Sequence, residues 1–248
     1  MRFVRGFFWL VLILQLAHAK GSADLIVCGM EKVFIISAEG GESPRWEWTA
    51  ELSAEIPESM RGAFATTDDC KPYRGYLLIT SSSGGVALVE RETRKCSFFT
   101  KVRNAHSACL VPGNLVAVAS SFGGDQLVIF SLGKSGSQVA PEMRLPLYGA
   151  HGVEWDWRRE CLWALGTEVL LKIEINDAKA VVVEEFKLPT PGGHDLTWWS
   201  ASELVLSVDR HCYLFSVTEN KFNRFLPLAD EVKVKSIHRS RKTGKLVW

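Results

Sequence analysis

Three histidines are the residues of this sequence whose spacing most suggests chemistry. His106, His151 and His194 stand in the motifs AHS, AHG and GHD, at intervals of 45 and 43 residues. Neutral imidazoles bind divalent transition metals, and the same rings transfer protons near neutral pH. The near-regular spacing predicts a structural repeat that brings the three side chains to equivalent positions.

The repeat is built from short apolar strands. From Asp24 onward, runs rich in Val, Ile, Leu, Phe and Trp are bounded by turn residues, and none keeps a helical period. The runs form groups of four, such as AHSACLVP, NLVAVASS, QLVIFSL and MRLPLY, and the groups recur about every 40 to 45 residues. This pattern predicts an all-β fold, a β-propeller of five or six four-stranded blades. A Greek-key sandwich is the alternative, but it would not explain the repeated order.

The two ends of the chain bear on how the ring closes. Residues 24–50 read as the last three strands of a blade, and VKSIHRS and KLVW near the C-terminus start another. The sequence stops at Trp248, within what should be a second strand. We therefore expect the last blade to be incomplete and the chain to be a fragment or a truncated variant.

The first nineteen residues read as a secretory signal peptide. Arg2 and Arg5 precede an apolar run from Phe7 to Leu16, which is short for a membrane span and ends in Ala-His-Ala. We expect residues 20–248 to form one propeller domain, secreted or periplasmic, without membrane attachment after signal cleavage. An uncleaved membrane anchor is the alternative.

Composition excludes several classes of partner and site. The 29 Lys and Arg residues nearly balance the 28 Asp and Glu residues and are scattered, so we expect no nucleic-acid partner. The six cysteines include no CxxC pair, which argues against a thiolate zinc site and leaves their disulfide status open. We expect a monomer.

The repeat also predicts which other residues join the histidines. In a propeller the inner strand of each blade lines the channel, and the loop that enters it opens on one face. Continuing the register forward reaches Lys235, with His238 as its rival, and backward it reaches the neighbourhood of Thr66. Carboxylates and an amine follow there. We assign proton transfer to Lys235, Asp68 and Asp69, and ligand binding to Lys71.

The loops between second and third strands should open on the same face. They read SSSGG, SSFGGD, GTE and DRH, and their small residues leave room above the ring. Asp209, Arg210 and His211 of the last loop are therefore candidate ligand contacts, although a solvated turn is the simpler interpretation. Trp155, Trp198 and Trp199 are interpreted as blade packing.

Three interpretations of the histidines remain open. They can hold a divalent transition metal such as Mn, Zn or Fe, leaving a position for a substrate oxygen. They can form a metal-free polar or catalytic site for an anionic substrate such as a uronic-acid sugar. They can also donate structural hydrogen bonds to carbonyls of neighbouring blades, which a repeat would itself repeat.

The motifs MRGAFATTDDCKP, SSSGGVALVERET, VRNAHSACLVPG, GAHGVEWDWRRECLWALG and PGGHDL, then VKSI followed by KTGK, span nearly the whole mature chain. In that order they resemble an uncharacterised family of bacterial secreted proteins that are similar to six-bladed propellers. The family's acidic pair usually reads Asp-Glu where this chain has Asp68 and Asp69, its pattern continues past Trp248, and it favours Lys235 over His238. A more distant similarity to oligogalacturonate-type polysaccharide lyases implies a metal held by clustered histidines near the channel.

These observations predict an exported propeller with a histidine-lined polar pocket at the channel mouth. The pocket would bind an oxygen-rich small molecule or a saccharide, and the protein would be a metal-dependent lyase-like or hydrolase-like enzyme. The alternative is a non-enzymatic cell-envelope binding or interaction scaffold with structural histidines.

Overall fold

The computed structural model describes residues 24–37, 43–176, 179–240 and 244–248. The signal peptide expected in residues 1–19 lies outside these ranges. Within them the chain is almost entirely β, and none of its helices has the length and hydrophobicity that a membrane crossing needs.

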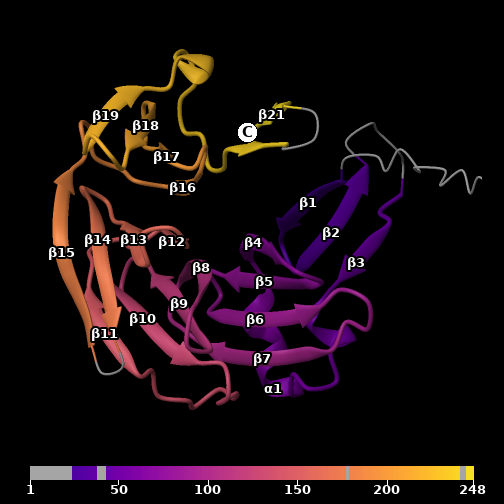
Figure 1. The fold of residues 1–248 in the computed structure, drawn as a ribbon. Helices are drawn as coiled ribbons and strands as arrows, with labels where there is room; N and C mark the ends of the chain where they lie inside the picture. Colours follow the sequence, from indigo (N-terminus) through magenta and orange to yellow (C-terminus); the bar gives the residue numbers. More distant parts are fainter. Residues whose placement is uncertain (1–23, 38–42, 177–178, 241–243) are drawn as a thin grey trace, which may run out of the picture.

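Four sheets of the described chain have four antiparallel strands each, which follow one another outward from the channel in chain order (Figure 1). They are β4 (Thr67–Tyr73), β5 (Tyr76–Ser81), β6 (Gly85–Glu90) and β7 (Cys96–Lys101); β8 (Ala105–Val111), β9 (Leu115–Ser120), β10 (Gln126–Ser131) and β11 (Met143–Pro146); β12 (Gly152–Asp156), β13 (Cys161–Leu165), β14 (Val169–Asn176) and β15 (Lys179–Lys187); and β16 (Asp195–Trp198), β17 (Glu203–Ser207), β18 (Cys212–Ser216) and β19 (Lys221–Arg224). The sheets stand side by side as blades of a propeller.

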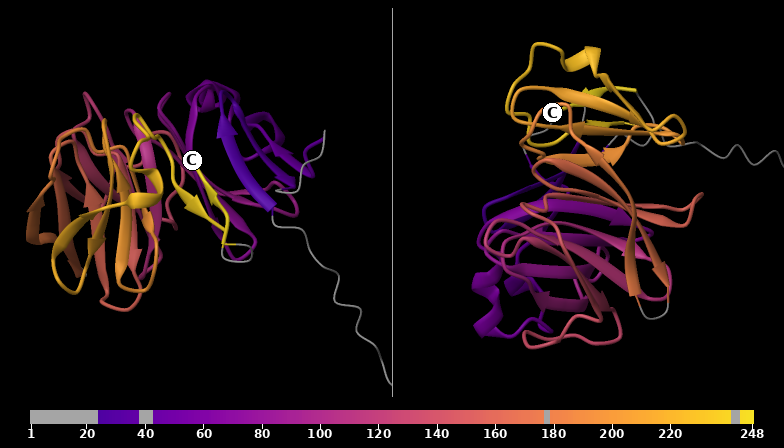
Figure 2. Two further views of the ribbon diagram at one scale, coloured as in Figure 1. Left: turned by 90° about the horizontal axis from the view of Figure 1, so that it is seen from above. Right: turned by 90° about the vertical axis from the view of Figure 1, so that its left-hand side faces the viewer.

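Two smaller sheets stand at the ends of the described chain. The first contains β1 (Asp24–Gly29), β2 (Lys32–Ser37) and β3 (Trp46–Trp48), and the last contains β20 (His238–Arg239) and β21 (Leu246–Val247). The C-terminal hairpin stands between the β16–β19 sheet and the β1–β3 sheet, as the view from above also shows (Figure 2). The prediction of a propeller whose last blade is partial is thus confirmed.

The direction of β1 fits its expected place as a second strand. Thr67 N, at the start of β4, donates a hydrogen bond to Met30 O in the turn after β1. The start of β4 also pairs with the end of β5, because Thr67 lies opposite Ser81. Strands β1 and β5 therefore run toward the same end of the channel. This agrees with the interpretation of residues 24–50 as the last three strands of a blade.

Apolar side chains fill the spaces between neighbouring blades. Trp163 of β13 is 1% exposed and packs against Phe215 of β18, with ring centroids 5.5 Å apart. Trp155 of β12 belongs to the buried cluster that joins the β8–β11 sheet to the β12–β15 sheet. Because each sheet covers one face of the next, a blade is stable only beside its neighbours.

Short helical segments occur mainly between β3 and β4. They are η1 (Ala50–Leu52), α1 (Glu58–Arg61) and η2 (Gly62–Phe64), and a further turn, η3 (Leu226–Leu228), follows β19. Phe64 of η2 lies against Trp48 with ring centroids 5.5 Å apart, and both belong to the buried cluster between the β1–β3 and β4–β7 sheets. All six cysteines are free thiols, and burial raises the pKa of Cys161 to about 11.

The inner strands approach one another so closely that side-chain size is restricted. A Cβ atom on Gly152 of β12 would lie 2.6 Å from Leu196 Cβ of β16. We expect Gly152→Ala to lower the free energy of unfolding by about 1–3 kcal/mol, because a rigid strand must move. Thermal and urea unfolding followed by circular dichroism measure this.

Gly62→Ala is the matched control for that substitution. Nothing lies within 4 Å of the position where its Cβ would stand, and its φ of −61° suits any residue. If Gly152→Ala unfolds like the wild type and like Gly62→Ala, the inner strands are not in close contact.

Candidate functional site

The start of each inner strand presents one side chain at the same mouth of the channel. In β8, Ala105 pairs with Ser120 and Ser107 with Ala119, so His106 is the extra residue of a β-bulge. Asp68 is the extra residue of the matching bulge in β4. Bulges redirect a side chain out of the regular pleat. Asp68 is therefore the structural counterpart of His106.

The other two histidines occupy the same position without a bulge. His151 N donates to Leu165 O and His194 N donates to Ser207 O, so each residue directly precedes its inner strand. The ring centroids of His106 and His151 are 4.5 Å apart, and those of His151 and His194 are 5.5 Å apart. The structure thus brings the three predicted histidines into one row, which we call the histidine mouth.

Burial keeps two of these rings neutral. Burial lowers the pKa of His151 to about 4, although its hydrogen bond to Gly149 O opposes the shift. Burial also lowers the pKa of His106, against the opposing charge of Asp68. At neutral pH both rings therefore carry one donor and one acceptor nitrogen. His151 Nδ1 lies 2.7 Å from Gly149 O, so its proton stands on Nδ1 and Nε2 is the acceptor.

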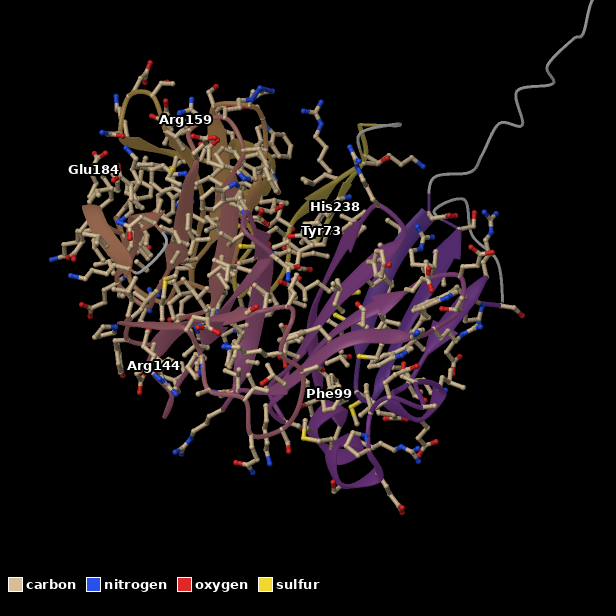
Figure 3. The ribbon with its side chains drawn as sticks, turned by 60° about the horizontal axis from the view of Figure 1, so that its bottom comes forward. Tyr73, Phe99, Arg144, Arg159, Glu184 and His238 are labelled. Atoms are coloured by element: carbon tan, nitrogen blue, oxygen red, sulfur yellow. The ribbon has the colours of Figure 1, made fainter. Side chains whose placement is uncertain are left out.

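His194 lies between an amine and a carboxylate. Asp209 Oδ1 is 2.9 Å from Nε2, and Lys235 Nζ is 3.0 Å from Nε2 and 3.2 Å from Nδ1. A carboxylate only accepts and an ammonium only donates, so both are satisfied when Nε2–H faces Asp209 and Nδ1 accepts from Lys235. Lys235 is therefore the residue that joins the histidine mouth. Its rival His238 lies on β20, in the C-terminal hairpin (Figure 3).

Asp68 lies beside His106 at the rim. Its Oδ1 atom is 3.8 Å from His106 Nδ1, and its Oδ2 atom accepts a hydrogen bond from Ser82 N in the loop after β5. Ser82 and Ser83 hydroxyls in turn contact the hydroxyl of Thr66 at 2.7 Å each. The rim therefore combines a carboxylate with a group of hydroxyls.

Two exposed aromatic rings beside the histidines were not predicted from the sequence. Phe122 is 49% exposed and Tyr148 is 64% exposed, and their ring centroids are 5.7 Å apart. Phe122 also meets His151 edge-on at 5.5 Å. Large aromatic side chains rarely stay open to solvent in adjacent pairs without a binding role. The signal was available, since Phe122 stands in the SSFGGD loop and Tyr148 just precedes His151.

Charged residues form a second layer deeper in the channel. Lys71 Nζ lies 2.9 Å from Glu154 Oε1 and 3.6 Å from Asp69 Oδ2, and it donates to Val153 O. Burial lowers the pKa of Lys71, but the nearby charges of Glu154 and Asp69 outweigh this and raise it overall. Ser107 Oγ donates to Asp69 at 2.7 Å. Lys71 and Asp69 are therefore held below the mouth, and their predicted roles toward a ligand stay predictions.

Asp195 is a channel carboxyl group whose pKa is raised far above its ordinary value. Burial raises its pKa to about 7, and the charge of Asp69 adds to the shift. Its Oδ2 atom accepts a hydrogen bond from Ile237 N at 2.7 Å, which ties β16 to the segment before β20. Neither Asp195 nor Glu154 was singled out from the sequence, because their importance comes from burial.

The remaining predicted contacts differ in their surroundings. Asp209 reaches the histidine mouth through His194, whereas Arg210 is exposed in the same turn. His211 Nδ1 is buried without a hydrogen-bond partner, and its ring lies edge-on to Tyr213 at 6.2 Å. The structure therefore brings Asp209 to the mouth, and the roles of Arg210 and His211 stay predictions.

Two of the three histidines make protein contacts with which a metal ion would have to compete. Across the described ranges, no group of three or more His, Cys, Asp or Glu residues is placed to bind one. His194 uses both nitrogens for Lys235 and Asp209, and His151 uses Nδ1 for Gly149. The ammonium of Lys235 would also repel a dication. The Mn, Zn or Fe site therefore remains a prediction from the sequence.

Comparisons with known proteins bear on fold and family. The sequence profile of a "Family of unknown function (DUF6528)" matches residues 23–175. No curated protein matches the chain significantly. Among solved structures, a chain of the "Crystal Structure of Mitotic Checkpoint Complex" is similar with a TM-score of 0.65 and 14% identity, over 90% of this chain and 67% of that one. A likeness at this identity concerns the fold alone.

The raised pKa of Asp195 predicts how stability changes with pH. The folded state keeps this proton up to about pH 7, whereas the unfolded chain releases it near its ordinary pKa of 3.8. The group therefore stabilises the fold most at low pH, and this contribution is lost as the pH rises through about 7. Asp195→Asn should flatten this part of the melting temperature profile between pH 4 and pH 8.

The carboxamide of that variant can still accept the hydrogen bond from Ile237. Asp230→Asn, at an exposed carboxyl group, is the control and should keep the wild-type profile. An Asp195→Asn protein with the same pH profile as the wild type would show that this carboxyl group does not titrate with folding.

Proposed function

The chain belongs to DUF6528, a family of unknown function, and we propose a function from the residues of its own site. We propose that the histidine mouth binds a saccharide or a similar oxygen-rich small molecule. One observation carries this proposal. A row of three imidazoles, in which His151 and His194 are 5.5 Å apart, is flanked by the exposed rings of Phe122 and Tyr148.

The chemistry of the mouth matches a ligand rich in hydroxyl groups. The neutral rings of His106 and His151 offer both a donor and an acceptor, and Asp68 and Asp209 add acceptors at the rim. Lys235 adds a donor and a positive charge. A sugar hydroxyl both donates and accepts, so this mixture fits it better than a surface of one sign.

The aromatic pair supplies a surface for the apolar side of such a ligand. A pyranose ring has a face of C–H groups, which packs on an aromatic ring and releases water from both surfaces. Phe122 and Tyr148 stand at 73° to each other, so each presents a separate face. The polar row then selects the hydroxyl pattern while the rings supply contact area.

For turnover, we propose that His194 is the proton-transferring group. Its Nε2 atom faces Asp209, which orients the ring, and its Nδ1 atom faces Lys235. An orienting carboxylate behind an imidazole is the arrangement that general bases use. If the ligand is a uronic-acid sugar, its carboxylate would draw the Lys235 ammonium away from Nδ1, and Nδ1 would then take the proton from the carbon next to that carboxylate. The C–O bond at the adjacent carbon would break as a C=C bond forms, and the leaving sugar oxygen would take up a proton, which is a lyase-like elimination.

A second function, as a binding scaffold without catalysis, is favoured by the position of His151. This residue is only 8% exposed, and its Nδ1–H bonds to Gly149 O in the loop that enters β12. A ring held in this way fixes the loop whether or not a ligand binds. The two functions share the binding site and differ in whether His194 transfers a proton.

We propose an extracytoplasmic location for either function. The support is the sequence from Arg2 to Ala19, whose charge, apolar run and small residues are typical of a secretory signal. Saccharides of the cell surface or medium are accessible to such a protein.

To test the binding proposal, Phe122 and Tyr148 are replaced. Isothermal titration of the purified protein with a panel of neutral and uronic-acid oligosaccharides should find at least one that binds. The double variant Phe122→Ala/Tyr148→Ala should then weaken this binding by about tenfold or more, because both contact faces are lost. The control is Leu226→Ala, an exposed apolar residue of η3 that belongs to neither proposed site. Equal binding by the double variant and the wild type would refute the proposal.

Substitutions of the histidines should separate ligand binding from support of the loop. His194→Ala should lose binding while keeping the melting temperature within a few degrees, because this ring lies at the rim. His151→Ala should cost about 1–3 kcal/mol of stability, since it removes a buried hydrogen bond and leaves a cavity. Calorimetry of both variants measures this, and the reverse pattern would contradict the assignment of roles.

A further inference from the structure

A second candidate binding site lies at the end of the channel opposite the histidine mouth. The inner strands start at the mouth, so the turns that follow β12 and β16 stand at the other end. A cavity of about 820 Å³ opens there. Its lining includes Trp155, Trp157, Trp198 and Trp199, and it reaches Glu154 in the channel. We call it the tryptophan cavity, and its size falls within the range of about 300–1,000 Å³ that small-molecule sites occupy.

The tryptophans do more than pack the blades. Trp155 is 5% exposed and Trp198 Nε1 donates to Trp155 O, so these two form a fixed wall. Trp157 is 66% exposed and stands at 76° to Trp155, with centroids 6.3 Å apart. The packing predicted from the sequence therefore accounts for Trp155 and Trp198. It does not account for an indole ring that is largely open to solvent at the edge of a cavity.

The charges around the cavity leave it cationic. Asp156 is 2% exposed. Its carboxylate forms an ion pair with Arg159 Nη1 at 2.9 Å and accepts hydrogen bonds from the backbone N–H groups of Arg158 and Arg159. Glu154 is paired with Lys71. Of the ion pairs within the described ranges, none involves the guanidinium of Arg158 or Arg239.

Arg239 is held in place at this end by an aromatic ring. Its guanidinium lies 4.8 Å from the centroid of Trp199. This stacking orients the group and leaves its N–H donors at the edge of the cavity. Two guanidinium groups without carboxylate partners among the described residues, beside an open indole ring, fit an anion that also has an apolar face.

We propose that the tryptophan cavity binds an acidic saccharide, whose carboxylate meets Arg158 or Arg239 and whose C–H face lies on Trp157. The geometry of the rings favours a sugar over a flat aromatic anion. Trp155 and Trp157 are nearly perpendicular, so they form no parallel slot between which a flat ring could be sandwiched. This site is independent of the proposed function, because it shares no residue with the histidine mouth.

Tryptophan fluorescence gives a direct readout of binding at this site. The probes are a glucuronic-acid trisaccharide and its carboxyl-reduced, neutral counterpart. Titration with the acidic sugar should change the tryptophan emission of the full chain saturably. The neutral sugar should bind at least about tenfold more weakly. Trp157→Ala should weaken binding of the acidic sugar by about tenfold or more, measured by titration calorimetry.

Two further variants identify the source of the preference. Arg158→Gln/Arg239→Gln should remove the difference between the acidic and the neutral sugar while keeping the fold, since both side chains are exposed. The Phe122→Ala/Tyr148→Ala variant should bind the acidic sugar at this cavity as the wild type does. If the histidine mouth binds no saccharide, the acidic sugar should still bind at the tryptophan cavity.

Three outcomes would overturn the proposal. The first is the absence of saturable binding with the acidic trisaccharide. The second is equal binding by the wild type and Trp157→Ala, with circular dichroism showing both to be folded. The third is saturable binding of a flat aromatic acid such as indole-3-carboxylate, displaced by neither sugar, which would assign the cavity to another ligand class.

Discussion

The close contact of neighbouring inner strands is the constraint on which the rest of this structure depends. Gly152 has no space for a side chain against Leu196, and apolar clusters fill the gaps between successive sheets from β1–β3 to β16–β19. A blade that must bury both faces against its neighbours takes one fixed position around the channel. Side chains at the same place in successive repeats are therefore brought together, although about forty residues separate them in sequence.

The same constraint sorts polar groups into layers along the channel. His106, His151 and His194 form the first layer, and Lys71 is held with Glu154 and Asp69 farther in. Buried charges cost free energy unless they are paired, so Lys71 and its carboxylates are interdependent.

The sequence was sufficient to predict the fold and the meeting of the histidines. Its four-strand groups predicted the blades, and the register that passes through His194 led to Lys235, which the structure places beside that ring. The backward register reached the neighbourhood of Thr66, whereas Asp68 is the counterpart of His106, because this repeat is shorter than the later ones. The matching bulges in the two strands identify the counterpart. A bulge of one residue leaves no clear mark in the sequence pattern.

Other site features depend on burial, which a single sequence shows only indirectly. Lys71 was assigned to ligand binding, and the structure shows it inside the channel, paired with Glu154. Asp195 became significant only because its surroundings raise its pKa to about 7. Phe122 and Tyr148 read as ordinary loop residues, and they became candidates because the fold leaves both exposed beside His151.

If the three imidazoles form one interacting row, the protonation of each ring influences the pKa of the others. Titration of the three rings measures this. NMR of protein labelled with ¹⁵N-histidine, assigned with single His→Gln variants, reports the pKa of each ring. We expect His151 to stay neutral down to about pH 4, and we expect replacement of His194 to raise the pKa of His106 and His151, because a protonated His194 would no longer repel their protonated forms. Three rings that titrate independently near their ordinary pKa of about 6.5 would contradict this expectation.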